Sequence, residues 1–289
     1  MKFSISLIFT QLRTVSLFTG AAILLSTPLF VTAQERIISA GASVTETIEI
    51  LKATKNVIAI DATSVQPTGE NLPNIGYHRQ LSAEGLIALK PTMIIGSDEM
   101  GPDTTLNLLK QSNIKVAIVN SEPTVDGLKV RIDQIAQLTN SESQSHSLKL
   151  LVDKQVADLQ SHAISKKKKM LFLLIHSGRP ANVAGSGTTP NAIINLIGGI
   201  NPAAAQLNSY KPISVESMIE MQPDVILVSG RSYDEIGGPD AVIKKLPMLA
   251  STPAGKTKSI VTIDGHALVG GLGMKSLAEA LRIQALIYP

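Results

Sequence analysis

The chain has 289 residues, a formal net charge of +3, no cysteine, no tryptophan and only 3% aromatic residues. The lack of cysteine excludes disulfides, thiolate metal sites and cysteine nucleophiles, and the small charge excludes a nucleic-acid-binding protein. Because aromatic residues are scarce, any apolar pocket is expected to be lined mostly by aliphatic side chains and methionine.

Residues 1–33 have the pattern of an export signal. Lys2 and Arg13 precede an apolar run from Val15 to Val31, and small residues up to Ala33 provide a cleavage site. A retained membrane anchor is the alternative, because the run is close to the lower length limit of a membrane span. Cleavage is favoured, and the mature chain is predicted to begin at Gln34, to have a net charge near +1 and to be soluble.

Short β-branched runs then alternate with helical patterns along the chain. Continuous apolar strands of this kind are typical of parallel sheets that are covered on both faces, so the sequence predicts an α/β fold. The expected strands are 36–39, 57–60, 93–96, 116–119, 170–175, 225–228 and 259–263.

Residues 141–169 contain neither proline nor glycine and predict one long helix. Apolar residues recur there at helical spacing, with charged residues on the other faces. The Lys166–Lys169 run is expected at the C-terminus of this helix, where cations favourably meet the helix dipole, rather than in a patch for nucleic acid or membrane. The expected organisation is an N-terminal lobe at 34–140, a linker helix at 141–169 and a C-terminal lobe at 170–289.

The chain also contains an internal repeat. The segment 81–97, LSAEGLIALKPTMIIGS, aligns without a gap to ISVESMIEMQPDVILVS at 213–229, and a glycine turn with its helix at 39–53 resembles 183–199. Ser82 and Ser214 are predicted N-caps, with Glu84 and Glu216 in the first helical turns. The repeat predicts two Rossmann-like lobes with a ligand cleft between them, at the carboxyl ends of the strands.

Catalytic motifs are weak. ASTPAGKT at 250–257 has Ala250 in place of the first glycine of a phosphate-binding loop, and Pro253 removes a backbone donor. AGSGT at 184–188 lacks the spacing of a nucleophile elbow, and the five histidines form no zinc motif. The sequence therefore favours a protein that is not an enzyme, with a secreted hydrolase as the less favoured alternative.

Polar, ligand-capable side chains gather at residues 76–86, GYHRQLSAEGL. Tyr77 is a candidate iron donor, because a phenolate suits ferric iron and the nearby cation Arg79 favours that anionic form. The corresponding strand exit in the second half carries His176, with Arg179 close by, so both walls of the cleft are expected to offer a donor and a cation.

At these residues the chain resembles the periplasmic haem-binding proteins of bacterial haem ABC importers, which belong to the long-helix class of binding proteins that also serves siderophores and cobalamin. The strings that carry the resemblance are RIISAGASVTETI at 36–48, GYHRQLSAEGLIALKPTMII at 76–95, HSGRPANVAG at 176–185, SYKPISVESMI at 209–219 and LPMLASTPAGK at 246–256.

The resemblance implies a monomeric periplasmic protein that binds ferric haem as cargo and delivers it to an inner-membrane ABC permease with its ATPase. It assigns Tyr77 as iron ligand with Arg79 in support, and His176 as a second candidate ligand. It also implies permease docking through the two lobe glutamates, Glu84 and Glu216.

Other candidate contacts and other functions stay open at this stage. His78, next to the tyrosine, either hydrogen-bonds a haem propionate or merely covers the loop, and the second interpretation is favoured. Tyr210 is either a haem contact or a packed aromatic residue. A ferric siderophore or cobalamin is the alternative ligand on the same scaffold.

Overall fold

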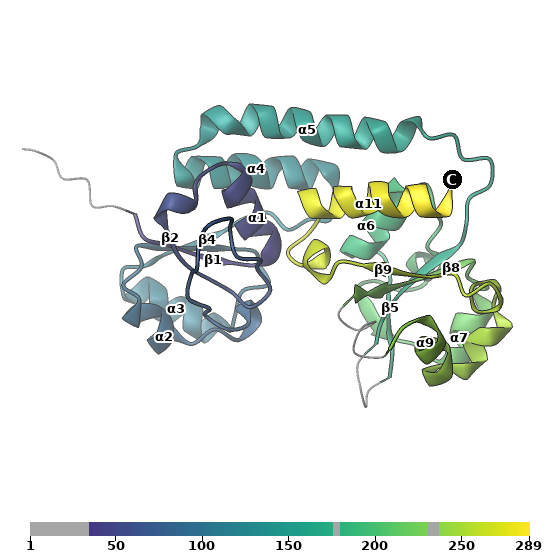
Figure 1. Cartoon of the computed structure of the whole chain (residues 1–289). Helices are drawn as coiled ribbons and strands as arrows, with labels where there is room; N and C mark the ends of the chain where they lie inside the picture. Colours follow the sequence, from purple (N-terminus) through teal and green to yellow (C-terminus); the bar gives the residue numbers. More distant parts are fainter. Residues whose placement is uncertain (1–34, 176–179, 231–236) are drawn as a thin grey trace, which may run out of the picture. The chain divides into compact units, whose positions relative to one another are not determined.

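The computed structural model describes residues 35–175, 180–230 and 237–289, and residues Gln34–Pro289 form one compact unit (Figure 1). The predicted signal segment lies outside the described residues. Among those residues, no helix combines the length and the apolar character needed to cross a membrane.

The described residues form two sheets, as the alternating pattern predicts. The first is entirely parallel in the order β2-β1-β3-β4, and the second has the order β7-β6-β5-β8-β9 with β5, β8 and β9 parallel. The α/β prediction is confirmed. The strands are β1 (Ile37–Ala40), β2 (Val57–Ile60), β3 (Met93–Gly96), β4 (Lys115–Ile118), β5 (Met170–Leu174), β6 (Asn182–Ala184), β7 (Tyr210–Pro212), β8 (Val225–Ser229) and β9 (Ile260–Ile263).

Two strands were not expected from the sequence. Strands β6 and β7 are antiparallel, only three residues long, and lie at one edge of the second sheet. Such short strands carry no readable alternation, and Pro212 in β7 is tolerated because an edge strand need not donate every backbone hydrogen bond.

Helices cover and connect the sheets. The α-helices are α1 (Ala42–Ile50), α2 (Ala83–Ala88), α3 (Asp103–Gln111), α4 (Val125–Thr139), α5 (Glu142–Ser161), α6 (Thr189–Leu196), α7 (Val215–Glu220), α9 (Pro239–Lys245), α10 (Pro253–Lys256) and α11 (Met274–Ile287). Short 3-10 helices are η1 (Thr54–Asn56), η2 (His78–Gln80), η3 (Pro202–Ala205), η4 (Pro247–Ser251) and η5 (Gly265–Leu268).

The repeat predicted from the sequence is present in both halves. Helices α2 and α7 are each six residues long, and their first turns are capped by the side chains of Ser82 and Ser214. Lys90 and Gln222 follow them with φ of 50° and 45°, each directly before the proline that leads into β3 or β8. The same cap, helix, turn and strand are therefore used twice.

The long helix is shorter than predicted. Helix α5 ends at Ser161, so the Lys166–Lys169 run follows the helix instead of occupying its last turn, and that expectation was wrong. Lys168 donates from its backbone to the Tyr288 hydroxyl (2.9 Å) and from its Nζ to the Ile287 carbonyl (2.9 Å). These contacts with the chain's last residues hold the segment in a non-helical path.

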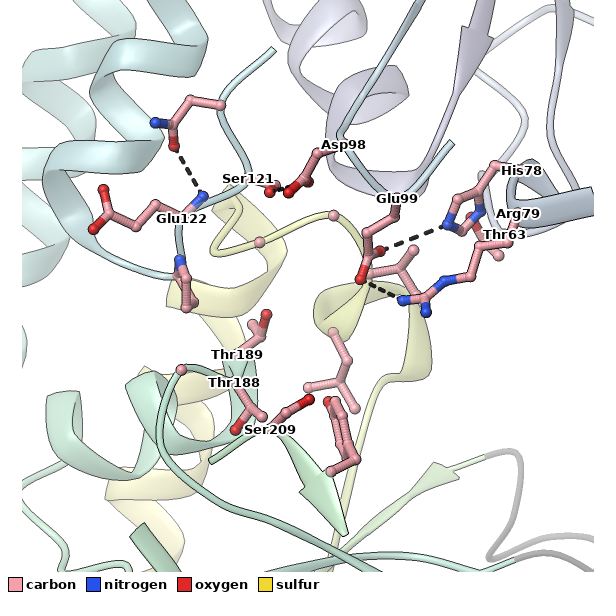
Figure 2. Close-up of a pocket in the computed structure, with 18 of the residues that line it drawn as sticks. Thr63, His78, Arg79, Asp98, Glu99, Ser121, Glu122, Thr188, Thr189 and Ser209 are labelled. Atoms are coloured by element: carbon pink, nitrogen blue, oxygen red, sulfur yellow. Dashed lines mark hydrogen bonds and ion pairs between the residues drawn. The ribbon is translucent and has the colours of Figure 1, made fainter. Parts of the chain in front are cut away.

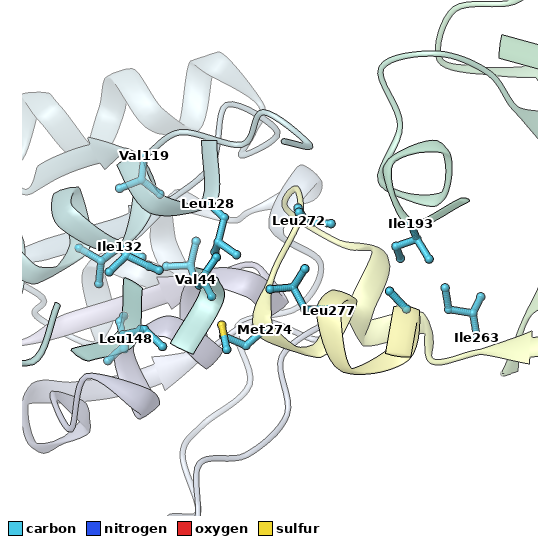
Figure 3. Packing of buried hydrophobic residues seen from close by; sticks show 14 of the residues in the cluster. Val44, Val119, Leu128, Ile132, Leu148, Ile193, Ile263, Leu272, Met274 and Leu277 are labelled. Carbon is cyan, nitrogen blue, oxygen red and sulfur yellow. The ribbon is translucent and has the colours of Figure 1, made fainter. Parts of the chain in front are cut away.

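One hydrophobic cluster links the helices to both sheets. Figure 1 shows α5 running alongside α4 and α11, and these pairs are in contact. The cluster extends from Val44 and Leu128, on α1 and α4, through Leu277 on α11 to Ile193 and Ile263, on α6 and β9 (Figure 3). The two sheets therefore share a core as well as a linker helix.

Candidate functional site

A pocket of about 1250 Å³ opens at the carboxyl ends of strands from both sheets. Its lining includes residues that follow β3, β4 and β9, the last residue of β8, and the turn before α6. This agrees with the rule that open α/β sheets bind ligands beyond the carboxyl ends of their strands. Figure 2 shows Arg79, Asp98, Glu99 and Glu122 on one side of the pocket and Thr188, Thr189 and Ser209 on another.

Tyr77 lies in this pocket, and 43% of its surface is exposed. It directly precedes η2, as the residue that caps this short helix, and its backbone is extended (φ −80°, ψ 126°). Gly76 before it adopts φ of 82°, which favours glycine, and its carbonyl accepts from the Ala62 backbone (2.8 Å). The Leu81 backbone donates to the Gly101 carbonyl (2.8 Å), which holds the other end of this segment.

Arg79 also lines the pocket and is half exposed. Its guanidinium forms an ion pair with Glu99, which follows strand β3. The contact with His78 and the charge of Arg79 outweigh burial and hold the pKa of Glu99 below its usual value. Arg79 thus shares the pocket lining with Tyr77, and it is held by a carboxylate, Glu99, that the sequence analysis did not single out.

His78 is buried, with 1% of its surface exposed. Its Nδ1 lies 2.9 Å from Asp61 Oδ2, and its Nε2 lies 3.6 Å from Glu99 Oε2. Burial lowers the pKa of His78, but the two carboxylates outweigh this and raise it. The ring therefore lies between two carboxylates, one at each of its nitrogens.

Tyr210, on the opposite sheet, lines the pocket and packs edge-on against Phe172, with ring centroids 6.4 Å apart and planes at 73°. Burial raises the pKa of Tyr210 well above 10, and the negative charge of Glu99 adds to that rise. The hydroxyl is therefore neutral at physiological pH. Tyr210 packs against Phe172 and also lines the pocket, so its packing is observed and a contact with haem stays a prediction.

Four other candidates were named from the sequence. Two of them, His176 and Arg179, fall outside the described residues. Glu84 and Glu216 are exposed in the first turns of α2 and α7, away from the pocket lining. The described residues contain no cluster of three or more histidine, aspartate or glutamate side chains that could hold a metal ion.

Sequence reasoning missed two carboxylates of the site. Asp61 and Glu99 come directly or shortly after the apolar runs 57–60 and 93–96. A search for polar residues at the ends of predicted parallel strands would have found both, since those ends meet at one edge of the sheet. It would not have paired them with His78.

Comparison with known proteins agrees with this architecture. Residues 37–267 match the family model described as "Periplasmic binding protein". The crystal structure of the periplasmic haem-binding protein HutB of Vibrio cholerae is 58% identical, with a TM-score of 0.85, over 89% of this chain and 100% of that one. The apo form of RhuT, a periplasmic haem-binding protein from Roseiflexus sp. RS-1, is 33% identical, with a TM-score of 0.83, over 89% and 98%.

A curated relative is named for a different ligand. The vitamin B12-binding protein of Yersinia pestis (strain Pestoides F) is 27% identical over 215 residues, which are 73% of this chain and 76% of that protein. The resemblance noted in the sequence is confirmed at the level of the family. This chain belongs to the periplasmic binding protein family.

Proposed function

We propose that this protein binds ferric haem in the periplasm and delivers it to an ABC permease in the inner membrane. The observation that carries the proposal is Tyr77, a half-exposed phenol beside Arg79 in the pocket of a periplasmic binding protein. The printed name of the 58% identical structure supports haem as the ligand. Family membership supports a transport component over an enzyme.

Tyr77 would supply the iron ligand. A phenolate oxygen is an established haem ligand, and the described residues provide no ready-made site for a bare ion. Arg79 would favour the anionic phenolate or pair with a propionate, after exchanging part of its contact with Glu99. Haem iron needs a donor atom that is accessible from the pocket, and the phenol oxygen of Tyr77 is proposed as that donor.

The porphyrin faces would be held by apolar side chains. Ile118, at the end of β4, lines the pocket with 48% of its surface exposed, and Leu268 and Val269 lie on the wall contributed by the second half of the chain. Each Å² of apolar area buried by the ligand contributes roughly 25 cal/mol. The expectation of a lining mostly of aliphatic side chains and methionine was wrong, because most of the described lining residues are polar residues or glycines, with aliphatic side chains between them.

Other residues have supporting roles in this proposal. Tyr210 would contact the ligand from the opposite wall as a neutral ring and hydroxyl. His176 would be a second iron donor and Arg179 a cation for the propionates, both carried over from the family resemblance.

Delivery would use two matched carboxylates. Glu84 and Glu216 are exposed at equivalent positions of two capped helices, one in each half of the chain. Two like charges repeated in this way suit a permease that presents a cation to each half of the protein. Export through the segment at residues 1–33 would place the protein where it can meet the permease.

The identity of the ligand is tested with protein that begins at Gln34. Ferric haem is added to the protein and followed by absorption spectroscopy, with hydroxocobalamin and a ferric siderophore as competitors. We expect a one-site or two-site haem complex with a tyrosinate-type ferric spectrum that neither competitor displaces.

Cobalamin is the second candidate, because a curated relative carries that name. Tight cobalamin binding with no spectral change on addition of haem would replace the proposal with this candidate. Hydrolysis of a simple ester, abolished by a single serine substitution, would point instead to the secreted hydrolase.

A further inference from the structure

His78 lies at the centre of a chain of charged groups at the pocket wall. Asp61 lies at one nitrogen of its ring and Glu99 at the other. Figure 2 shows Glu99 between His78 and Arg79, with the Arg79 guanidinium paired to the other carboxylate oxygen. Nε2 is buried and has no hydrogen-bond partner among the described residues, although it faces Glu99 at 3.6 Å. A buried nitrogen without a hydrogen bond costs folding stability, so its presence calls for an explanation. Holding neighbouring groups in place is one such explanation.

The Asp61 end of this chain is fixed. Asp61 is fully buried directly after β2, and its carboxylate accepts from the Gly41 backbone (3.0 Å), the Thr63 hydroxyl (2.6 Å) and the Ser64 hydroxyl (2.5 Å), besides His78. Burial alone would raise the pKa of Asp61, but these bonds outweigh it and lower the pKa to about 2. The anchor is therefore an anion held rigidly on the first sheet.

The other end reaches the groups that face the pocket. The ring of His78 meets the Tyr77 ring edge-on, with centroids 4.8 Å apart and planes at 66°. The His78 backbone carbonyl accepts a hydrogen bond from the Gly101 backbone (3.0 Å), which holds this segment in place. Glu99 contacts both the same ring and the Arg79 guanidinium, and so links the two.

We propose that His78 is a positioning residue, which holds the Tyr77 phenol and the Arg79 guanidinium in the orientation that the ligand requires without itself touching the ligand. The inference rests on the proposed haem-binding function. It assigns Asp61 as the anchor of the arrangement and Glu99 as the link to Arg79. The ring is buried, and its two nitrogens lie 2.9 and 3.6 Å from protein carboxylates, which is the basis for giving His78 no direct contact with haem.

Two substitutions distinguish the contact of His78 with Asp61 from its contact with Glu99. In His78→Asn the amide nitrogen takes the place of Nδ1 and keeps the bond to Asp61, whereas in His78→Gln it takes the place of Nε2 and keeps the contact with Glu99. Each variant is measured for the melting temperature of the free protein and for the rate of ferric haem release to a haem scavenger.

We expect these two readouts to separate. His78→Asn should melt within a few degrees of the wild type yet release haem about tenfold faster, with a broadened tyrosinate absorption band. His78→Gln should melt lower but release haem within about threefold of the wild-type rate. A purely structural role would make the release rates follow the melting temperatures, and that order, or unchanged release in both variants, would overturn the proposal.

The matched control is His266, which pairs through Nδ1 with Asp264 (2.8 Å) on another 3-10 helix, η5, but is partly exposed and is not part of the pocket lining. His266→Ala should leave the haem release rate unchanged. A tenfold change there would mean that release responds to any Asp–His pair, which would also overturn the proposal.

A ligand-free readout keeps this test independent of the haem proposal. The chain has four tyrosines, so the ring signals of Tyr77 in tyrosine-labelled protein can be assigned by their loss in Tyr77→Phe. These signals should shift in His78→Asn and stay in place in His266→Ala. If the wild type bound no haem, the proposed function would fail while these signals still decided the positioning role. Unchanged Tyr77 signals in both His78 variants would refute it.

Discussion

The two walls of the pocket are built from different chemistry. Among the described lining residues, the charged side chains, with His78, come from the first half of the chain, at 78–79, 98–99 and 122. The described wall of the second half consists of glycines, hydroxyl-bearing residues and apolar side chains, with Tyr210 as its titratable group. Burial raises the pKa of Tyr210, which keeps it neutral.

We call the charged wall from the first half of the chain the fixed wall, and the uncharged wall from the second half the neutral wall. Two carboxylates on and behind the first wall are paired with cationic partners: Glu99 with Arg79, and the buried Asp61 with His78. Ion pairs hold the side chains of this wall in fixed orientations, and a bond to a metal requires a ligand in a fixed orientation. The second wall offers apolar contact surface, which suits the faces of a flat ligand, and neutral hydrogen-bonding groups, which suit its edges. Substitutions on the first wall should therefore have the larger effects.

The largest effect on folding is expected at Asp61. Its pKa is about 2 in the folded protein against an ordinary value of 3.8, so its charge stabilises the fold above pH 3.8 and this contribution is lost as the pH falls through 2. The shift corresponds to about 2 kcal/mol. Urea unfolding should show Asp61→Asn less stable than the wild type by about that amount at pH 6, and by about half of it at pH 3. A gap that does not change with pH would contradict this account of Asp61.

A smaller effect, on binding alone, is expected at Arg79. Half of its surface is exposed, so its loss removes the cation beside Tyr77 without disturbing the core. Arg79→Ala should weaken ferric haem binding about tenfold, equivalent to about 1.4 kcal/mol, with an unchanged melting temperature. Arg79→Lys should recover part of the affinity. Equal affinity in all three proteins would remove Arg79 from the site.

The smallest effect is expected on the neutral wall. Tyr210→Phe keeps the ring that packs against Phe172 and removes only the hydroxyl. Haem affinity, measured by the same titration, should change less than about threefold, about 0.7 kcal/mol. A loss greater than that of Arg79→Ala would reverse the ranking of the two walls.

The sequence predicts the fold well where the signal is local. Apolar runs identified the seven longer strands, and the serine, glutamate and proline pattern identified the repeated helices α2 and α7. The end of α5 and the edge strands β6 and β7 could not be predicted in this way. They depend on tertiary contacts, such as the bonds from Lys168 to the last residues of the chain.

The site was predictable to the same extent. Tyr77, His78 and Arg79 are neighbours in sequence and were found together. Their carboxylate partners are 17 and 20 residues away in sequence and meet them only because β2 and β3 flank β1 in the first sheet. The role of His78 follows from those partners, so the sequence alone left it between two interpretations.

The central claim is that Tyr77 is the iron ligand on the fixed wall. The most direct measurement is the absorption spectrum of the ferric haem complex of Tyr77→Phe beside that of the wild type, both from Gln34 onwards. The substitution keeps the ring and its edge contact with His78 but removes the oxygen. We predict a tyrosinate-type spectrum in the wild type that is lost in the variant, with the free proteins melting alike. An unchanged spectrum in Tyr77→Phe would contradict the claim.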